Sequence, residues 1–295
     1  MKRKGIILAG GSGTRLYPAT AVISKQLLPV YDKPMIYYPL STLMVAGIQE
    51  VLIISSPIQL PMFQTLLGNG HQLGMHIAYA AQTEPRGIAE ALMIAESFLA
   101  HAPSTLILGD NLFFGQGLSE LLTGIVQKNC GATLFASRVR DPERFGVVTF
   151  NTQGKAITLE EKPKLPKSDF AATGLYFYDE TASERARTLK PSQRGELEIT
   201  DLNKLYLDDE ILFVEPLGRG IAWLDAGTPN ALLQASMFIE VLSERQSLKV
   251  ACLEEIAWRN RWISTNELLK FTDSIRNSDY GKYLIHLVEV ENSVV

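Results

Sequence analysis

The stretch GIILAGGSGTR at residues 5–15 joins a short apolar run to a glycine-rich turn and a cation. An apolar run without alternation is typical of a strand covered on both faces, as in a parallel sheet flanked by helices. Glycines let the backbone approach a ligand closely, and their successive N–H groups form an anion-binding hollow. The stretch therefore predicts a first parallel strand that ends in a phosphate-binding loop, and a tight turn without a ligand is the alternative.

Three known glycine-loop motifs differ from this one. A Walker A loop is excluded because no Gly-Lys-Ser/Thr follows. The dinucleotide-binding fingerprint matches Gly11 and Gly13 but fails at Leu16, where a small residue should pack the helix against the strand. A protein-kinase loop lacks its companion signatures. The small residues followed by Arg15 favour a triphosphate as the ligand.

Short β-rich runs alternate with segments of helical period, which indicates βαβ units. We expect an α/β fold with a Rossmann-like mixed, mostly parallel sheet flanked by helices. The expected strands span residues 5–9, 50–55, 76–80, 105–108, 132–137, 147–150, 173–178, 211–215 and 221–224. The expected helices include residues 35–46, 88–99 and 118–128.

The character of the chain changes at Thr228-Pro229, which resembles an N-cap followed by proline at the first helical position. Helical patterning continues from there, without convincing strand alternation. We therefore expect a core over residues 1–245 and a C-terminal helical appendage over residues 246–295.

Composition excludes several classes of protein. The 295 residues carry 28 Lys and Arg against 32 Asp and Glu, a net charge of −4, whereas proteins that bind nucleic acid along their surface are normally basic. No run approaches the ~18 apolar residues of a membrane span, and the apolar run after Met1 is too short for a signal peptide. Cys130 and Cys252 lack a CxxC spacing. These features predict a cytoplasmic protein that binds neither nucleic acid nor membranes.

Two carboxylates follow apolar runs that are expected to form strands. Asp110 closes residues 105–108 after a glycine, and Asp225 follows residues 221–224. In open α/β sheets, ligands bind at the carboxyl ends of strands, and Mg²⁺ prefers one or two carboxylates together with substrate phosphates. The pair suggests a magnesium site, and the alternative is that each Asp caps the next turn or helix.

Three cations are candidate phosphate contacts. Lys25 lies ten residues after Arg15 and beside an apolar pair. Lys162 follows Glu161, and a carboxylate for sugar hydroxyls beside a cation for phosphate would suit a sugar phosphate. Because alternate strand residues point to opposite faces, these two need not act together. Arg194 has acidic neighbours of its own, and a solvated surface charge is the alternative for all three cations.

In order along the chain, nine motifs resemble those of the sugar-1-phosphate nucleotidylyltransferases. They are ILAGGSGTRL (7–16), SKQLLP (24–29), DKPM (32–35), LGDN (108–111), RFGVV (144–148), EEKP (160–163), TGLYFY (173–178), RGELEIT (194–200) and WLDAGT (223–228). The tail ACLEEIAW at 251–258 is similar to that of the short, tetrameric members. Nine motifs in order identify the family far more strongly than any one of them.

The resemblance is strongest to the members that transfer dTMP from dTTP to glucose 1-phosphate. It implies a Mg²⁺-dependent in-line displacement that yields dTDP-glucose and pyrophosphate, a homotetramer, and feedback inhibition by a downstream dTDP-sugar. It also divides the core into a nucleotide-binding part of about 1–115 and a sugar-phosphate-binding part of about 116–245, and it gives the appendage an oligomerisation or regulatory role.

Residue roles also follow from the resemblance. Those for dTTP fall on Leu8, Gly10, Gly11, Gly13, Thr14, Arg15, Lys25, Gln82, Gly87 and Asp110. Those for glucose 1-phosphate fall on Asn111, Phe145, Gly146, Glu161, Lys162, Ala172, Thr173, Gly174 and Arg194. Those for Mg²⁺ fall on Asp110 and Asp225, and those for catalysis on Arg15, Lys25, Asp110 and Lys162. A regulatory site would include Gly115, Arg219, Cys252, Glu255, Ile256 and Arg259.

Four positions depart from the family pattern. Arg86, Glu90, Ala172 and Ala226 stand where an acid, a glutamine, a valine and a threonine are usual. These changes bear on the choice between dTTP and UTP and on the choice of sugar. The alternatives are a UTP-using or other sugar-1-phosphate nucleotidylyltransferase, a non-catalytic nucleotide-sugar sensor, and an NAD-dependent oxidoreductase, which Leu16 disfavours.

Overall fold

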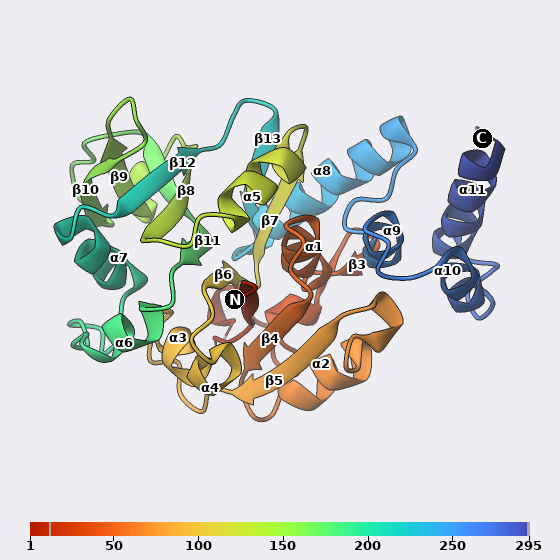
Figure 1. Ribbon diagram of the computed structural model, residues 1–295, viewed down its shortest axis with the longest axis horizontal. Helices are drawn as coiled ribbons and strands as arrows, with labels where there is room; N and C mark the ends of the chain where they lie inside the picture. Colours follow the sequence, from red (N-terminus) through yellow and green to blue (C-terminus); the bar gives the residue numbers. More distant parts are fainter. Residues whose placement is uncertain (12, 294–295) are drawn as a thin grey trace.

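A nine-stranded mixed sheet forms the centre of the molecule (Figure 1), in a computed structural model that describes residues 1–11 and 13–293. Its strands are β1 (Lys4–Leu8), β4 (Glu50–Ser55), β5 (His76–Ala81), β6 (Ser104–Leu108), β8 (Ala132–Arg138), β9 (Gly146–Phe150), β10 (Ala156–Glu161), β11 (Phe170–Tyr178) and β12 (Leu212–Pro216). Their order is β10-β9-β11-β6-β1-β4-β5, with β8 beside β11 and β12 beside β8. All the strands expected from the sequence form.

Two kinds of pairing divide this sheet. Strands β6, β1, β4 and β5 run parallel to one another, as crossover connections through helices require. Strand β11 runs antiparallel to β6, β8 and β9, and β10 runs antiparallel to β9. Strand β12 runs parallel to β8 at the edge of this second group. The predicted Rossmann-like mixed α/β fold is confirmed.

Two small sheets lie beside the large one. The first pairs β2 (Pro29–Val30) with β3 (Lys33–Pro34), and the second pairs β7 (Asn111–Gly115) with β13 (Ile221–Asp225), both antiparallel. Strand β7 was not expected from the sequence because it follows β6 after a turn of only two residues. Its pairing with β13 brings together segments about 110 residues apart, with Asp225 opposite Asn111.

Helices cover both faces of the large sheet (Figure 1). They are α1 (Tyr37–Val45), α2 (Leu60–Leu67), α3 (Glu90–Ile94), α4 (Glu96–Leu99), α5 (Leu118–Val126), α6 (Ala182–Arg187), α7 (Ile199–Asp208), α8 (Pro229–Gln246), α9 (Leu253–Arg259), α10 (Thr265–Thr272) and α11 (Asp279–Ser293). Short 3-10 turns are η1 (Thr14–Leu16), η2 (Lys25–Leu27), η3 (His71–Leu73) and η4 (Pro142–Arg144). The helix expected over residues 88–99 is interrupted at Ala95, and α2, α6 and α7 are not among the helices named from the sequence.

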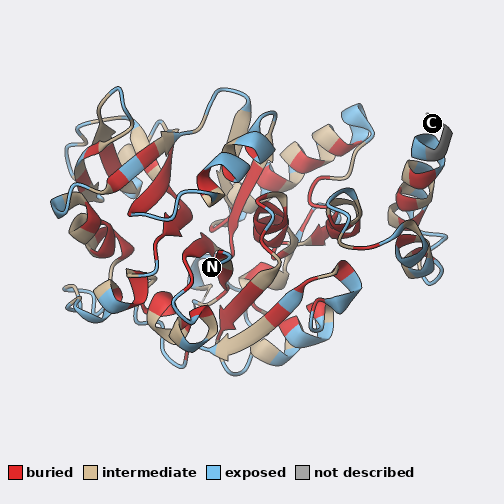
Figure 2. Ribbon diagram, in the orientation of Figure 1, coloured by how far each residue is buried: buried red, intermediate tan, exposed pale blue. Residues whose placement is uncertain are grey.

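Alternate residues of the parallel strands enter two different cores. Ile7 and Ile53 pack with α1, α2 and α5 on one face, whereas Ile6 and Ile54 pack with α3, α6 and α7 on the other. Buried residues therefore run continuously along the central strands (Figure 2). This burial on both faces explains why these strands read as unbroken apolar runs.

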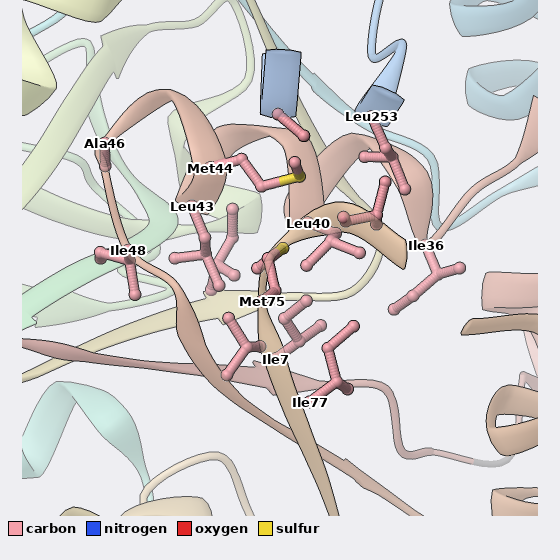
Figure 3. Packing of buried hydrophobic residues seen from close by; sticks show 14 of the residues in the cluster. Ile7, Ile36, Leu40, Leu43, Met44, Ala46, Ile48, Met75, Ile77 and Leu253 are labelled. Carbon is pink, nitrogen blue, oxygen red and sulfur yellow. The ribbon is translucent and has the colours of Figure 1, made fainter. Parts of the chain in front are cut away.

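The C-terminal helices share the first of these cores. Leu253 of α9 belongs to the same buried cluster as Ile7, Ile36 and Leu40 (Figure 3), and Leu284 of α11 also belongs to it. Helices α10 and α11 lie at the opposite end of the molecule from α7 (Figure 1). The segment after residue 246 is thus helical and packed on the core, while its treatment as a separate domain with a boundary near 245 stays a prediction.

The start of α8 provides a test of the predicted cap. The Thr228 hydroxyl accepts a hydrogen bond from the Ala231 N–H at 3.3 Å. We expect Thr228→Ala to lower the free energy of unfolding by about 1 kcal/mol, since one N–H of the first turn loses its acceptor. Urea titration checks this, with Asn230→Ala, an exposed change in the same turn, as the control. Equal midpoints for the two variants would contradict the assigned cap.

Candidate active site

A cavity of about 300 Å³ lies where parallel strands end. Leu8 ends β1, Leu108 ends β6, and Gln82 directly follows β5. The residues lining it are Leu8, Gly10, Gly11, Arg15, Lys25, Gln26, Gln82, Pro85, Gly87, Ile88, Leu108, Asp110 and Glu196. The cavity therefore occupies the place where open α/β sheets bind ligands.

Eight of the ten residues predicted for nucleotide binding line this cavity, which is called the nucleotide cavity from here on, and Gly13 and Thr14 do not. Gly13 has a left-handed φ of 61° and its carbonyl accepts a hydrogen bond from the Thr20 hydroxyl at 2.8 Å. Ser12, which the sequence placed in the same loop, lies outside the described residues. The structure thus joins the loop to Lys25 and Gln82, which are distant in sequence.

The sequence reasoning missed five lining residues: Gln26, Pro85, Ile88, Leu108 and Glu196. Gln26 is fully buried beside the loop, where its amide receives a hydrogen bond from the Ser24 hydroxyl at 2.5 Å. Its position next to Lys25 in SKQLLP was the available signal. Glu196 reaches the cavity because Leu197 pairs with the loop after β5, with Leu197 N–H donating to the Arg86 carbonyl at 2.7 Å.

The two predicted metal ligands converge. The Ala226 N–H donates to the Asp110 carbonyl at 3.0 Å, so the turn after β13 lies directly on the turn after β6. A Cβ built on Gly227 would lie 3.0 Å from Asp225 Oδ1 and 3.6 Å from both Asp110 Oδ2 and Arg15 Nη2. Because Gly227 has no side chain, a hollow stays open here, and two carboxylates and a guanidinium border it.

Two carboxylates and two cations influence one another in this hollow. Burial, and then the neighbouring charge of Asp110, raise the pKa of the Asp225 carboxyl, while Lys25 and Arg15 oppose that shift. The Lys25 ammonium already forms an ion pair with Asp110 Oδ2. Two carboxylates beside a phosphate loop are the donor set that Mg²⁺ uses with substrate phosphates and water. Among the described residues no group of three or more His, Cys, Asp or Glu side chains is placed to hold a metal.

The side chains of Glu161 and Lys162 lie against each other at the end of β10. Lys162 follows β10 with a φ of 44°, which breaks strand alternation, and its ammonium lies 3.1 Å from Glu161 Oε1. Glu161 Oε2 accepts a hydrogen bond from the Thr200 hydroxyl at 2.6 Å and faces Gly146. The alternation rule left open whether these two act together, and the structure brings them into contact.

Asn111 links three segments beside this pair. Its side-chain oxygen accepts hydrogen bonds from the Gly174 N–H at 3.0 Å and from Trp223 Nε1 at 2.6 Å. The Trp223 ring in turn meets the Phe145 ring edge to face, with centroids 5.3 Å apart. The Thr173 hydroxyl is buried and has no hydrogen-bond partner in the described part of the chain. These contacts link Asn111, Phe145 and Gly174, three of the residues predicted for the sugar phosphate.

Arg194 is engaged by acidic neighbours in this structure. Its Nη2 donates to both carboxylate oxygens of Glu198, at 2.9 and 2.8 Å, and lies 3.5 Å from Glu196. The Glu198 hydrogen bond is the main reason why the pKa of the guanidinium is raised. Arg194 does not line the nucleotide cavity, although Glu196 of the same loop does.

Comparison with known proteins gives the family. Residues 4–241 match the model of the nucleotidyl transferase family. The chain belongs to that family. This match spans the glycine-rich loop, both converging aspartates and the Glu161–Lys162 pair.

Individual relatives cover nearly the whole chain. The glucose-1-phosphate thymidylyltransferase of Neisseria meningitidis is 54% identical over 97% of this chain and 99% of that protein. The enzymes of the same name from Xanthomonas campestris and Mycobacterium tuberculosis are 55% and 51% identical, with at least 97% of each chain covered. The chain is thus a nucleotidyl transferase similar along its length to these proteins.

Solved structures agree with the fold. A Bacillus anthracis structure, described as a glucose-1-phosphate thymidylyltransferase in complex with sucrose, is 42% identical with a TM-score of 0.73, covering 80% of this chain and 94% of that one. A UDP-glucose pyrophosphorylase complexed with UDP-glucose has a TM-score of 0.72 at 23% identity, covering 81% of this chain and 98% of that one. The second likeness shows the shared fold alone.

The predicted regulatory residues of this nucleotidyl transferase lie at a second cavity of about 300 Å³. Five of the six line it: Gly115, Cys252, Glu255, Ile256 and Arg259. Arg219 lines an adjoining cavity of about 620 Å³, which shares Gly115. Burial raises the pKa of the Cys252 thiol to about 12. The second cavity shares no lining residue with the nucleotide cavity.

The helices of the protein include no candidate membrane-spanning segment in the part of the chain that the structure describes. Within residues 1–11 and 13–293, none is both long enough and apolar enough to cross a bilayer.

Proposed function

We propose that the protein transfers the dTMP part of dTTP to α-D-glucose 1-phosphate and releases pyrophosphate, forming dTDP-glucose. The observation that carries the proposal is the meeting of the glycine-rich loop, Arg15 and Lys25 with the two carboxylates Asp110 and Asp225. The ion pair between Glu161 and Lys162 adds to it. Relatives that are 45–55% identical over nearly the whole chain are named for this reaction.

The chemistry requires little acid–base machinery. A phosphate oxygen of glucose 1-phosphate forms a bond to the α-phosphorus of dTTP, and the bond from that phosphorus to the bridging oxygen breaks, so pyrophosphate leaves with the electron pair. A phosphate monoester has a second pKa near ~6 and is already anionic at pH 7. A general base is therefore unnecessary, which agrees with the lack of a histidine or serine motif in the sequence.

The site must supply positive charge and alignment. Arg15 faces the leaving pyrophosphate, Lys25 holds a phosphate of dTTP, and Lys162 holds the phosphate of the sugar. Gln82 and Gly87 contact the thymine edge, and Glu161 accepts hydrogen bonds from sugar hydroxyls. When bound by Asp110 and Asp225, Mg²⁺ would supply further positive charge against the repulsion between the two phosphates.

The same proposal extends to assembly, control and location. We infer a cytoplasmic homotetramer that works in nucleotide-sugar biosynthesis. We also infer that a downstream dTDP-sugar inhibits it by binding the second cavity, where Glu255 and Arg259 form an ion pair at 2.8 Å. Sedimentation of the purified protein tests the tetramer, and inhibition kinetics with dTDP-sugars test the feedback.

A substrate panel tests the reaction. The purified protein is incubated with glucose 1-phosphate and each of dTTP, UTP, dCTP and ATP, with Mg²⁺ or with EDTA, and pyrophosphate release is measured. We expect turnover with dTTP, loss of turnover with EDTA and recovery on adding Mg²⁺. Turnover with UTP alone would contradict the dTTP assignment, and binding without turnover would favour a sensor.

A further inference from the structure

The amide of Gln82 is held in one orientation at the wall of the nucleotide cavity. Gln82 is 7% exposed, and its Nε2 donates to Glu90 Oε2 at 2.8 Å and to the Gly87 carbonyl at 3.3 Å. Both amide hydrogens are therefore used by the protein. The Oε1 atom lies against Gly10, since a Cβ built there would be 2.8 Å from it.

The carboxylate of Glu90 makes this orientation obligatory. Glu90 is 6% exposed at the start of α3, and its Oε1 accepts from Arg86 Nε at 2.9 Å and lies 2.8 Å from Arg86 Nη2. A carboxylate paired with a guanidinium accepts hydrogen bonds and donates none. If the Gln82 amide were reversed, its oxygen would face the Glu90 carboxylate and the Gly87 carbonyl with no hydrogen between them.

Gln82 therefore presents a hydrogen-bond acceptor, Oε1, to the cavity and no donor. No donor within the described part of the chain is bonded to Gln82 Oε1, and the residue lines the cavity. Thymine and uracil carry a hydrogen on N3, whereas cytosine presents a lone pair there. An acceptor at this place attracts the first two bases and repels the third.

We propose that Glu90 is a positioning residue that selects bases with an N3–H by fixing the Gln82 amide with its oxygen toward the base. The inference rests on the proposed function, because it requires the base of a nucleotide at this cavity. Glu90 does not itself line the cavity, so it acts through Gln82. Arg86, which is exposed, assists by holding the Glu90 carboxylate in place.

The variant Glu90→Gln tests this orientation directly. The family pattern has an acid at position 86 beside its glutamine, whereas here Arg86 donates toward position 90, so the oxygen of the introduced amide faces Arg86 and its NH₂ group faces Gln82. The Gln82 amide then reverses and turns its NH₂ group toward the cavity, where it suits cytosine. We expect the ratio of dTMP to dCMP affinity to fall by about tenfold, the effect of one hydrogen bond gained or lost. The ratio of dTMP to UMP affinity stays unchanged, because both bases carry N3–H.

Isothermal titration with dTMP, UMP and dCMP measures these affinity ratios. Steady-state rates with dTTP, UTP and dCTP give the corresponding ratios of turnover. The matched control is Glu84→Gln, which removes the same charge from an exposed position in the same loop and leaves both ratios as in the native protein. Glu90→Ala, which also releases the amide, serves if Glu90→Gln does not fold.

Several outcomes would overturn the inference. These are an unchanged dTMP to dCMP ratio in the folded variant, an equal loss of affinity for all three nucleotides, or no preference for dTMP in the native protein. A native protein that binds dTMP selectively but does not turn over dTTP would refute the proposed function and leave this inference to be judged from the titrations.

Discussion

Replacing Arg15 with alanine is expected to lower kcat for dTTP by about a thousandfold or more, the range found when an arginine that meets migrating phosphate charge is lost. Arg15 lies on η1 directly after the glycine-rich loop and lines the nucleotide cavity. Its Nη2 lies 3.6 Å from the place that a Cβ built on Gly227 would occupy, in the hollow that Asp110 and Asp225 share. In the proposed reaction, the guanidinium at this place meets the charge that develops as pyrophosphate leaves.

The fold should survive this change. The Arg15 side chain is exposed, so its removal leaves no buried cavity. The thermal midpoint should stay close to that of the native protein, and the rate of pyrophosphate release gives kcat. Arg15→Lys is the matched variant: it keeps the charge but loses the planar pair of donors, and we expect it to recover part of the rate. A kcat for Arg15→Ala within a few-fold of the native value would show that the assignment of Arg15 is wrong.

The sequence predicted the components of this site better than their arrangement. Asp110 and Asp225 were singled out because each closes an apolar run, and that reasoning needs only local pattern. Their meeting depends on β7 pairing with β13, and β7 was not predicted because only two residues separate it from β6. Pairing between segments about 110 residues apart leaves no local signal.

The contacts of Glu90 at the nucleotide cavity also could not be predicted from local sequence. The sequence marks Glu90 as a departure from a family pattern, but it does not show which neighbouring side chain Glu90 contacts. The loop between Gln82 and Glu90 is fixed by Leu197, whose N–H and carbonyl pair with Arg86 and Ala89. That contact folds the loop so that the two side chains meet at 2.8 Å. Tertiary contacts of this kind determine the orientation of side chains, which the periodicity of the sequence does not predict.

Replacing Asp225 with asparagine is expected to stabilise the metal-free protein and to lower turnover by about 10²–10³-fold, the usual cost of losing one electrostatic contact to a transition state. The asparagine oxygen retains the place of Asp225 Oδ1, which accepts the Gly227 N–H at 3.1 Å. The change therefore removes charge and little else. Activity is lost because the hollow keeps only one of its two carboxylates for Mg²⁺.

The gain in stability follows from the pKa of Asp225. Burial and the charge of Asp110 raise this pKa in the folded protein above its unfolded value, so the folded state binds the proton more tightly. The stability that this carboxyl contributes is fully present below the unfolded pKa and is lost as pH rises through the folded pKa. At pH 7 the charged group therefore destabilises the metal-free fold, and we expect the variant to melt about 1–3 °C higher.

Thermal unfolding from pH 4 to pH 8 in EDTA measures this difference. The native midpoint should fall relative to that of Asp225→Asn as the carboxyl ionises, and Asp208→Asn, an exposed change of the same charge, should follow the native curve. With Mg²⁺ added, the native protein should melt at a higher temperature than Asp225→Asn, because the ion binds the native pair of carboxylates and raises only the native midpoint. A variant that melts lower than the native protein in EDTA, or gains equally from Mg²⁺, would show that Asp225 is a structural acid and not a metal ligand.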